Sequence, residues 1–338
     1  MPATAPTSRR LRVLTWHVHG SYLWYLSHAP CDFYVPVKPG RPPGYGGVAG
    51  WWSWPPSMIE VPADEVASLD VDVVLFQSRQ HWEVDQEELL SPAQRRLPRV
   101  FLEHDPPRES PTDTRHVVDD PDVTVVHVTH FNDLMWDCGR SPTRVIEHGV
   151  VVPDGVRYTG EVERALVVVN GLGRRGRRLG ADVVERLRGD VPLDVVGMWS
   201  DEVGGLGEVP PPALPGFAAR YRVFLNPIRY TSLGLAVCEA MQVGMPIVGL
   251  ATTEMVTAVE HGVSGYLETD VQRLGQRVRQ LLDDPDEARE LGRAARRSAL
   301  VRFGIDRFAR DWAELLAEVA GTRPAPVGVA GTPSRNGG

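Results

Sequence analysis

Short apolar runs alternate with longer amphipathic stretches along most of the chain. This alternation is typical of α/β layers built around parallel sheets. The apolar runs predict strands over residues 12–16, 71–76, 99–102, 123–128, 144–146, 165–169, 193–196, 223–225 and 247–250. A chain of 338 residues with this pattern fits two domains of ordinary size better than one compact core.

The composition of successive segments divides the chain further. Pro, Gly, Ser and Thr dominate both ends, so we expect disorder over residues 1–10 and 321–338. Between these ends we expect one Rossmann-like α/β domain over residues 11–150 and a second over residues 151–304. A terminal helix is expected over residues 305–320.

Polar residues follow nearly every predicted strand of the N-terminal half. His17 and His19 come after the first strand, and His104 comes after the third. Open parallel sheets bind ligands beyond the carboxyl ends of their strands, and two facing sheets form a cleft between domains. Turns also collect polar residues without any function, so this pattern alone leaves both explanations open.

Residues 41–56 contain too much Gly and Pro for regular structure. Three tryptophans lie in this stretch, at Trp51, Trp52 and Trp54. They fit either a stacking platform for a sugar or acceptor, or a loop packed onto the core. Both interpretations remain open from the sequence.

Charge and cysteine content exclude several classes of protein. The formal net charge of −8 argues against nucleic-acid binding. Lys38 is the single lysine, so a bound anion must be met by arginines or backbone amides. Three widely spaced cysteines suit a reducing cytoplasm, and no apolar run reaches the roughly 18 residues of a membrane span. Peripheral contact with a lipid acceptor at the inner membrane face stays open.

Residues 226–265 are the most informative stretch of the sequence. We predict a strand end followed by a helix from about Leu235 to Val243, which Gly244 and Pro246 terminate. The helix is short and apolar, and it follows a loop of small residues. A loop and helix of this kind position a helix N-terminus at the end of a parallel strand.

The start of this helix is suited to a diphosphate. Beyond Thr231, Ser232 and Gly234, the backbone N–H groups and the positive end of the helix dipole are free. Glu239 lies one turn beyond Leu235 on the same face, and helical side chains lean toward the N-terminus. Its carboxylate is therefore well placed for ribose hydroxyls.

The sequence T-S-L-G-L-A-V-C-E-A-M over residues 231–241 is followed by G-M-P-I-V and E-H-G-V-S-G. This run resembles the nucleotide-sugar signature of the group 1 (family 4) retaining glycosyltransferases, E-G-F-G-L-x-x-x-E-A-M with G-x-P-V-V and E-x-V-x-x-G-x-x-G. The second glutamate of that signature is Glu239, to which the resemblance gives the donor ribose. Thr231 replaces the first glutamate, which in the family touches the transferred sugar.

Weaker matches extend over most of the chain. Residues 147–150, E-H-G-V, look like the interdomain linker of the family. His104 is similar to a family histidine that approaches the transferred sugar. Residues 306–319 match the terminal helix that crosses back to the N-terminal domain in these proteins.

The resemblance implies a GT-B architecture, with two Rossmann-like parallel-sheet domains facing a cleft. It implies transfer of a sugar from a nucleoside diphosphate sugar to a small-molecule, glycan or lipid acceptor, with retention of configuration. The donor is then a co-substrate, and no cofactor or metal is needed. His104 and Thr231 are the catalytic candidates, and the acceptor-side candidates are His19, Gly20 and Trp52.

A competing motif, G-L-G-R-R-G over residues 171–176, follows an apolar strand. By itself it predicts a dinucleotide site and an NAD(P)-dependent oxidoreductase. The acid that should follow is misplaced, because Asp194 falls inside the next predicted strand. Under the resemblance, Gly171 and Gly173 instead hold the donor diphosphate. The arginines that follow are candidates to reach it, namely Arg174, Arg175, Arg177 and, best placed, Arg178.

Nine of the ten histidines precede residue 150, but no His-Glu-x-x-His helix accompanies them, and we predict no metal site. The Thr231 replacement keeps a second function open. A catalytically silent relative would bind a nucleotide sugar without transferring it.

Overall fold

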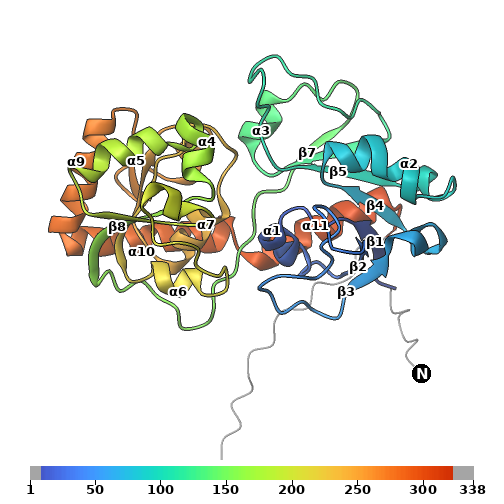
Figure 1. Ribbon diagram of the computed structural model, residues 1–338, viewed down its shortest axis with the longest axis horizontal. Coiled ribbons are helices and arrows are strands. Elements are labelled where there is room, and N and C mark those ends of the chain that lie inside the picture. Colours follow the sequence, from blue (N-terminus) through green and yellow to red (C-terminus); the bar gives the residue numbers. More distant parts are fainter. Residues whose placement is uncertain (1–8, 323–338) are drawn as a thin grey trace, which may run out of the picture.

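The computed structural model describes residues 9–322. Figure 1 shows two lobes side by side, each built around a parallel sheet. Residues 1–8 and 323–338, where we expected disorder, lie outside the described residues. Arg9 and Arg10 lie inside them and form salt bridges to Asp72 and Asp32. In the described part of the chain, no helix has the length and apolar character to cross a membrane.

The N-terminal sheet has seven parallel strands in the order β3-β2-β1-β4-β5-β6-β7. The strands are β1 Leu11–Thr15, β2 Cys31–Val37, β3 Met58–Pro62, β4 Val73–Phe76, β5 Arg99–Glu103, β6 Val123–His127 and β7 Thr143–Val145. The helices between them are α1 Gly20–Leu26, α2 Gln86–Leu89 and α3 His130–Met135, with shorter helical turns at Ala63–Ser68, His81–Asp85 and Gln94–Arg96.

The C-terminal sheet has five parallel strands in the order β12-β11-β10-β8-β9. They are β8 Val162–Val168, β9 Leu193–Val196, β10 Tyr221–Asn226, β11 Ile247–Leu250 and β12 Gly265–Glu268. The helices are α4 Leu172–Leu179, α5 Ala181–Arg188, α6 Leu214–Ala218, α7 Leu235–Val243, α8 Met255–Ala258, α9 Val271–Asp283, α10 Pro285–Arg302 and α11 Ile305–Val319, with a helical turn at Ser200–Val203.

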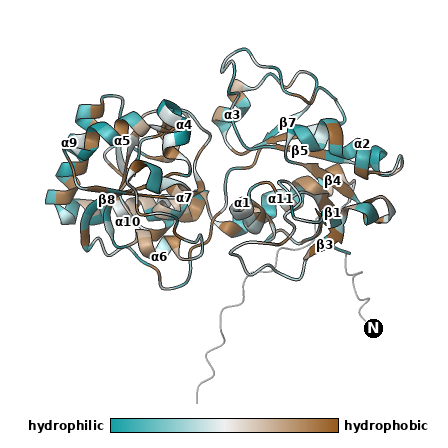
Figure 2. Cartoon of the chain, in the orientation of Figure 1, coloured by the Kyte–Doolittle hydropathy of each residue, from teal (hydrophilic) through white to brown (hydrophobic). Residues whose placement is uncertain are grey.

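Helices cover both faces of each sheet. In the C-terminal domain, α5 and α9 pack on one face, and α6, α7 and α10 pack on the other. In the N-terminal domain, α1 and α11 share a core with one face of the sheet. Figure 2 shows hydrophobic strands near β4 and largely hydrophilic outer sides on α2 and α9. The apolar surfaces therefore meet inside each layer.

The chain crosses between the domains twice. After β7 a linker enters the C-terminal domain, and α11 returns to the N-terminal domain and packs against α1. The two crossings touch where Val150 forms a bridge with Gly304. Gln242 of α7 donates hydrogen bonds from its amide to the carbonyls of both Val150 and Phe303. The C-terminal end of α7 is thereby tied to the two crossings, which form a hinge region around Val150 and Gly304.

The predicted strands all occur, with ends that differ by up to three residues. Three strands were not predicted, namely β2, β3 and β12. β2 contains Pro36, and β3 and β12 lie at the edges of their sheets. Short edge strands tolerate polar residues, so β3 and β12 lack a clear apolar run, whereas β2 is an inner strand whose apolar pattern Pro36 interrupts.

Candidate active site

The start of α7 lies at the carboxyl end of β10, as the sequence predicted. Gly234 is the N-cap in an extended conformation, and Gly244 ends the helix with φ +99°. Among the described residues, the amides of Gly234, Leu235 and Ala236 have no hydrogen-bond acceptor. In a helix of nine residues these free N–H groups and the dipole favour an anion.

The glycine-rich loop lies beside this helix start. Gly171 begins α4 with φ +63°, and Gly176 breaks the helix with φ +55°. Gly180 packs directly on the carbonyl of Pro227, in the loop after β10. The amides of Arg229 and Tyr230 in that loop both donate to the carbonyl of Arg178, at 3.0 and 3.2 Å. These contacts hold Arg178 against the loop that leads to the N-terminal end of α7.

Two of the candidate arginines are engaged elsewhere. Arg174 forms a salt bridge to Glu202, and its guanidinium stacks over the Trp199 ring at 4.0 Å. Arg177 pairs with Asp182. Arg174, expected to bind the donor, therefore has its charge already compensated in this structure. Gly173 was also expected to hold the donor. The Val203 side chain lies against this glycine, where a Cβ would point.

Arg175 and Arg178 have no salt-bridge partner within residues 9–322, unlike their neighbours. Burial lowers the pKa of Arg178, and so do the like charges of Arg108 and Arg175. Arg108 belongs to the N-terminal domain and bonds to Asp105. Two guanidinium groups that are unpaired in the described chain and a third that Asp105 partly compensates therefore gather where the two domains meet, in an arrangement that favours an anion.

Glu239 lies one turn inside α7 and is only 8% exposed. Its carboxylate accepts a hydrogen bond from the Tyr25 hydroxyl at 2.7 Å, although Tyr25 belongs to α1 of the other domain. Burial raises the pKa of Glu239 to about 7, and the bond from Tyr25 offsets part of this effect. The expected ribose ligand thus faces the domain boundary but is already engaged.

The N-terminal wall of the site carries a fixed histidine. Gln77 donates from its amide to the Thr15 hydroxyl and the Trp16 carbonyl, so its amide oxygen accepts from His104 Nε2 at 3.0 Å. Burial lowers the pKa of His104 well below its ordinary value, with His19 and His148 contributing. His104 is therefore neutral at pH 7, with its proton on Nε2 and an acceptor at Nδ1.

The acceptor-side candidates surround this histidine and α1. The ring of His19 lies edge-on to His104, with centroids 4.6 Å apart. Gly20 begins α1 and allows close approach to His17. Trp52 stacks on Trp24 at 4.2 Å.

Two of the three tryptophan rings in the loop over residues 41–56 pack against the protein. One face of Trp52 is covered by Trp24, and the indole nitrogen of Trp54 is buried. Trp51 is 60% exposed. The packed-loop interpretation therefore holds for Trp52 and Trp54.

Thr231 and Ser232 complete the loop before α7. Thr231 is partly buried and Ser232 is buried. The preceding Tyr230 donates its hydroxyl to the Pro107 carbonyl of the N-terminal domain at 2.8 Å. His148 Nε2 donates to the Leu233 carbonyl at 2.7 Å. The loop is thus fixed from both the N-terminal domain and the linker.

Sequence reasoning missed the contributions of Tyr25, Arg108 and Tyr230. Tyr25 lies in the run S-Y-L-W-Y-L, whose pattern indicates only a buried helix face. Arg108 and Tyr230 lie in loops, where an isolated charge or ring carries no positional signal. Within residues 9–322 no three His, Cys, Asp or Glu side chains gather as a metal site.

The dinucleotide interpretation of the glycine motif is disfavoured by the geometry. Asp194, the acid nearest to the required position, is held by two bonds from Arg164 at 2.8 Å and by the Tyr221 hydroxyl at 3.0 Å. A depression of about 500 Å³ that Arg164 helps to line, with residues 188–193, reaches the amino end of β9. It therefore lies at the opposite edge of the sheet from the arginines.

Comparison with known proteins fits this geometry. Residues 181–284 match the family model of group 1 glycosyl transferases. A segment of 126 residues is 35% identical to a D-inositol 3-phosphate glycosyltransferase of Thermobispora bispora. That match covers 35% of this chain and 29% of the relative, so the chain spans less than a third of the curated relative it matches.

Solved structures match almost the whole chain. Sucrose-phosphate synthase from Thermosynechococcus elongatus superposes with a TM-score of 0.67 over 93% of this chain and 100% of its own, at 16% identity. The chain has the GT-B fold. HepE of Anabaena in complex with UDP-glucose, another GT-B protein, gives 0.63 over 91% of this chain and 100% of its own, at 14% identity. The predicted fold class and the resemblance to group 1 glycosyltransferases are confirmed.

Proposed function

We propose that this GT-B protein is a glycosyltransferase that takes a sugar from a nucleoside diphosphate sugar held by its C-terminal domain. One observation carries the proposal. Two arginines without salt bridges, Arg175 and Arg178, lie beside a helix start whose amides have no acceptor in the described chain. Arg108 of the opposite domain, which is paired with Asp105, lies close enough for its charge to lower the pKa of Arg178. A diphosphate matches this arrangement in charge and in its need for several donors.

The remaining donor contacts follow from position on α7. Glu239 would accept hydrogen bonds from the ribose hydroxyls, one turn from the amides of Gly234 and Leu235. The loop at Gly171 would lie along the diphosphate. The Arg175 guanidinium lies beside this glycine, within contact distance of the position that a Cβ on Gly171 would take. The neighbour HepE is described in complex with UDP-glucose. Uridine diphosphate sugars are therefore the first donors to test.

The chemistry we propose is transfer with retention and without a metal. The leaving diphosphate gains negative charge as the sugar bond breaks, and fixed cations and amides stabilise that charge. Arg178, Arg175 and the α7 amides would supply this stabilisation. His104 presents Nδ1 as an acceptor for a sugar hydroxyl, and the two domains hold donor and acceptor in one geometry. Thr231 stands where a glutamate would touch the sugar.

The experiment is a binding panel followed by turnover. Titration calorimetry with UDP, GDP, TDP, ADP and NAD should show micromolar binding of at least one nucleoside diphosphate and none of NAD. Binding of NAD alone would contradict the proposal. Release of free nucleoside diphosphate from the matching sugar donors, across an acceptor panel, then measures transfer.

The Thr231 replacement supports a second candidate, a silent relative that binds the donor without transferring it. Tight donor binding with no turnover across the whole panel would favour this candidate. A Thr231→Glu variant separates the two further. It should gain turnover if the lost carboxylate is the cause, because it restores a contact to the transferred sugar.

A further inference from the structure

We propose that Tyr25 is a latch, whose hydroxyl occupies the Glu239 carboxylate in the donor-free protein and must leave before the donor ribose can bind. The inference rests on the proposed function, because it assigns the ribose to Glu239. It adds that the N-terminal domain competes for that carboxylate. Release of the Tyr25 hydroxyl is then a step of donor binding.

The latch joins two elements that are far apart in sequence. Tyr25 lies on α1 and Glu239 on α7, 214 positions later, and their bond of 2.7 Å is buried. The Tyr25 side chain is 1% exposed. A charged or polar pair shielded from water in this way holds more strongly than an exposed one. The bond is thus a substantial contact between the domains.

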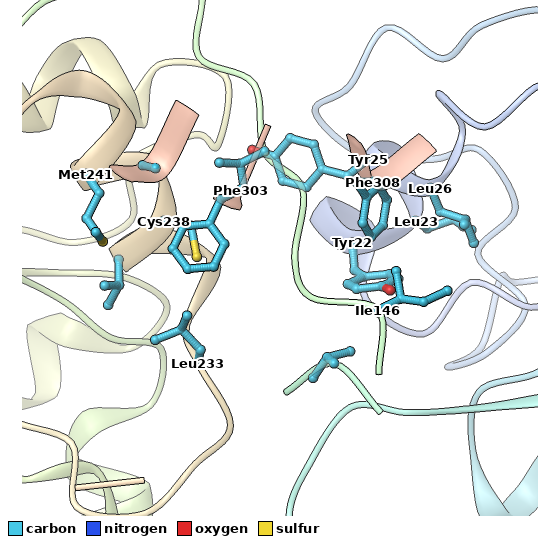
Figure 3. Close-up of a cluster of buried hydrophobic side chains, with 14 of the residues drawn as sticks. Tyr22, Leu23, Tyr25, Leu26, Ile146, Leu233, Cys238, Met241, Phe303 and Phe308 are labelled. Atoms are coloured by element: carbon cyan, nitrogen blue, oxygen red, sulfur yellow. The ribbon is translucent and has the colours of Figure 1, made fainter. Parts of the chain in front are cut away.

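Tyr25 has no free space into which its ring can turn. Its ring packs against Trp24 at 5.1 Å and lies 6.2 Å from Trp52, which stacks on Trp24. Tyr25 also shares one continuous apolar core with Cys238 of α7 and Phe303 of the hinge region. Figure 3 shows Tyr25 between the two domains, directed toward the C-terminal one. Freeing Glu239 therefore requires α1 to move as a unit.

Little free space remains beside Glu239 within its own domain. A cavity lined by residues of β8, β10, α6 and α7, Glu239 among them, measures about 10 Å³. That volume is close to the minimum for one water molecule. Glu239 is therefore closely packed on the C-terminal side, and on the N-terminal side its carboxylate meets the Tyr25 hydroxyl.

Two more bonds hold the domains at this spacing. The amide of Phe131, in the first turn of α3, donates to the buried carboxylate of Glu254 at 2.9 Å. Tyr230 donates to the Pro107 carbonyl at 2.8 Å. Both contacts use a backbone group of the N-terminal domain and contribute no group to the ribose position. Tyr25 is therefore the contact whose loss changes what Glu239 can accept.

A Tyr25→Phe variant tests the latch by removing the hydroxyl and keeping the ring. In the donor-free variant, Glu239 has lost its buried partner. The donor ribose then no longer competes with a tyrosine hydroxyl for the Glu239 carboxylate. Binding of UDP should become 3- to 10-fold tighter by calorimetry, a change of about 0.7 to 1.4 kcal/mol. The matched control is Tyr158→Phe, which removes a hydroxyl bonded to the Arg222 carbonyl within the C-terminal domain. It should leave UDP affinity within twofold.

The same gain must disappear in the Tyr25→Phe/Glu239→Gln double variant, because the competition requires the carboxylate. Unchanged or weaker UDP binding by folded Tyr25→Phe protein would overturn the latch while leaving the proposed function intact. Should UDP, GDP, TDP and ADP all fail to bind both the wild type and Tyr25→Phe, the proposed function and the latch fail together.

A second measurement needs no variant. Hydrogen–deuterium exchange of the wild type with saturating nucleotide should become faster over residues 20–26, where α1 leaves α7, and slower at the start of α7. Unchanged or slower exchange over residues 20–26 alongside protection of α7 would contradict the latch. This outcome would mean that the donor enters without moving α1.

Discussion

Arg178 of the C-terminal domain and Arg108 of the N-terminal domain lie close enough that the charge of one lowers the pKa of the other. Like charges repel across the domain boundary, and Asp105, which pairs with Arg108, offsets part of this repulsion. The like charges become favourable when an anion lies between them. This relationship is the electrostatic basis of the proposed donor site.

Replacing Arg178 by alanine should weaken binding of the preferred nucleoside diphosphate by about 10- to 100-fold, since a charge-assisted bond is worth about 1.5–3 kcal/mol. Calorimetry at fixed salt measures the change. Arg177→Ala is the matched control, because Arg177 is the adjacent residue and is already paired with Asp182. Equal losses in the two variants would mean that the effect is general surface charge and not a site.

Arg174→Ala and Arg175→Ala should separate in the same assay. Arg174 is neutralised by Glu202 and stacked on Trp199, so its loss should change nucleotide affinity less than twofold. Arg175 has no such partner within residues 9–322, and its loss should cost about tenfold. A larger loss of affinity in Arg174→Ala than in Arg175→Ala would place the anion on the other side of the glycine loop.

Glu239→Gln should affect stability and binding in opposite directions. Burial raises the pKa of Glu239 from its ordinary 4.5 to about 7, so folding opposes its ionisation. The stability that this group contributes is present below pH 4.5 and is lost as the pH rises through 7. The shift corresponds to a loss of up to about 3 kcal/mol at pH 8. Urea unfolding at pH 5 and pH 8 should show this loss in the wild type and a flatter profile in Glu239→Gln.

The same variant should bind nucleoside diphosphates more weakly, because an amide presents one acceptor oxygen where the carboxylate presents two. A variant that is less stable at pH 8 than the wild type, or one that binds nucleotide equally well, would contradict the assignment of Glu239.

His148 should make the protein sensitive to acid. Burial lowers its pKa from 6.5 to about 4, so the folded state keeps it neutral while the unfolded state takes up a proton. Its contribution to stability is present above pH 6.5 and is lost as the pH falls through 4, by up to about 3 kcal/mol. A His148→Asn variant keeps a donor for the Leu233 carbonyl and should lose less stability between pH 7 and pH 4.5. The exposed His28, changed to Asn, should leave the profile as it is.

Gly180→Ala should destabilise the junction of the two loops. Gly180 has φ +86°, and an added Cβ would lie 2.1 Å from the Pro227 carbonyl oxygen. We expect a loss of about 2 kcal/mol or more by urea unfolding, with weaker nucleotide binding, since Arg178 is anchored there. Gly189→Ala is the control, because φ is −74° and nothing lies within 4 Å. Equal effects of the two substitutions would contradict the close packing.

The sequence predicted the fold and one half of the site well, for physical reasons. Helix α7 was predicted from Leu235 to Val243 with its Gly244 cap because strand, loop, glycine and proline signals are all local. The anion-binding character of its start follows from backbone geometry alone. The role of Arg178 as the donor-binding arginine stays a prediction, and the structure places this residue near the C-terminal end of α4.

The other half of the site depends on which residues two separate domains bring together. Tyr25 and Glu239 are joined only after both sheets have folded and α11 has returned to the N-terminal domain. The pairing of Arg174 with Glu202 likewise depends on the turn after β9. Neither contact leaves a periodic or compositional trace in the sequence. The edge strands β3 and β12 and the inner strand β2 were missed because their burial comes from neighbours that the local pattern does not contain.

Amide chemical shifts measure the central claim most directly. In a transverse-relaxation-optimised spectrum of labelled protein, titration with the preferred nucleoside diphosphate should shift the amides of Leu235 and Ala236 strongly, as their free N–H groups acquire phosphate oxygens. The Arg178 and Gly171 amides should shift with the same dissociation constant. Saturable binding that leaves Leu235 and Ala236 unmoved would show that the anion lies elsewhere.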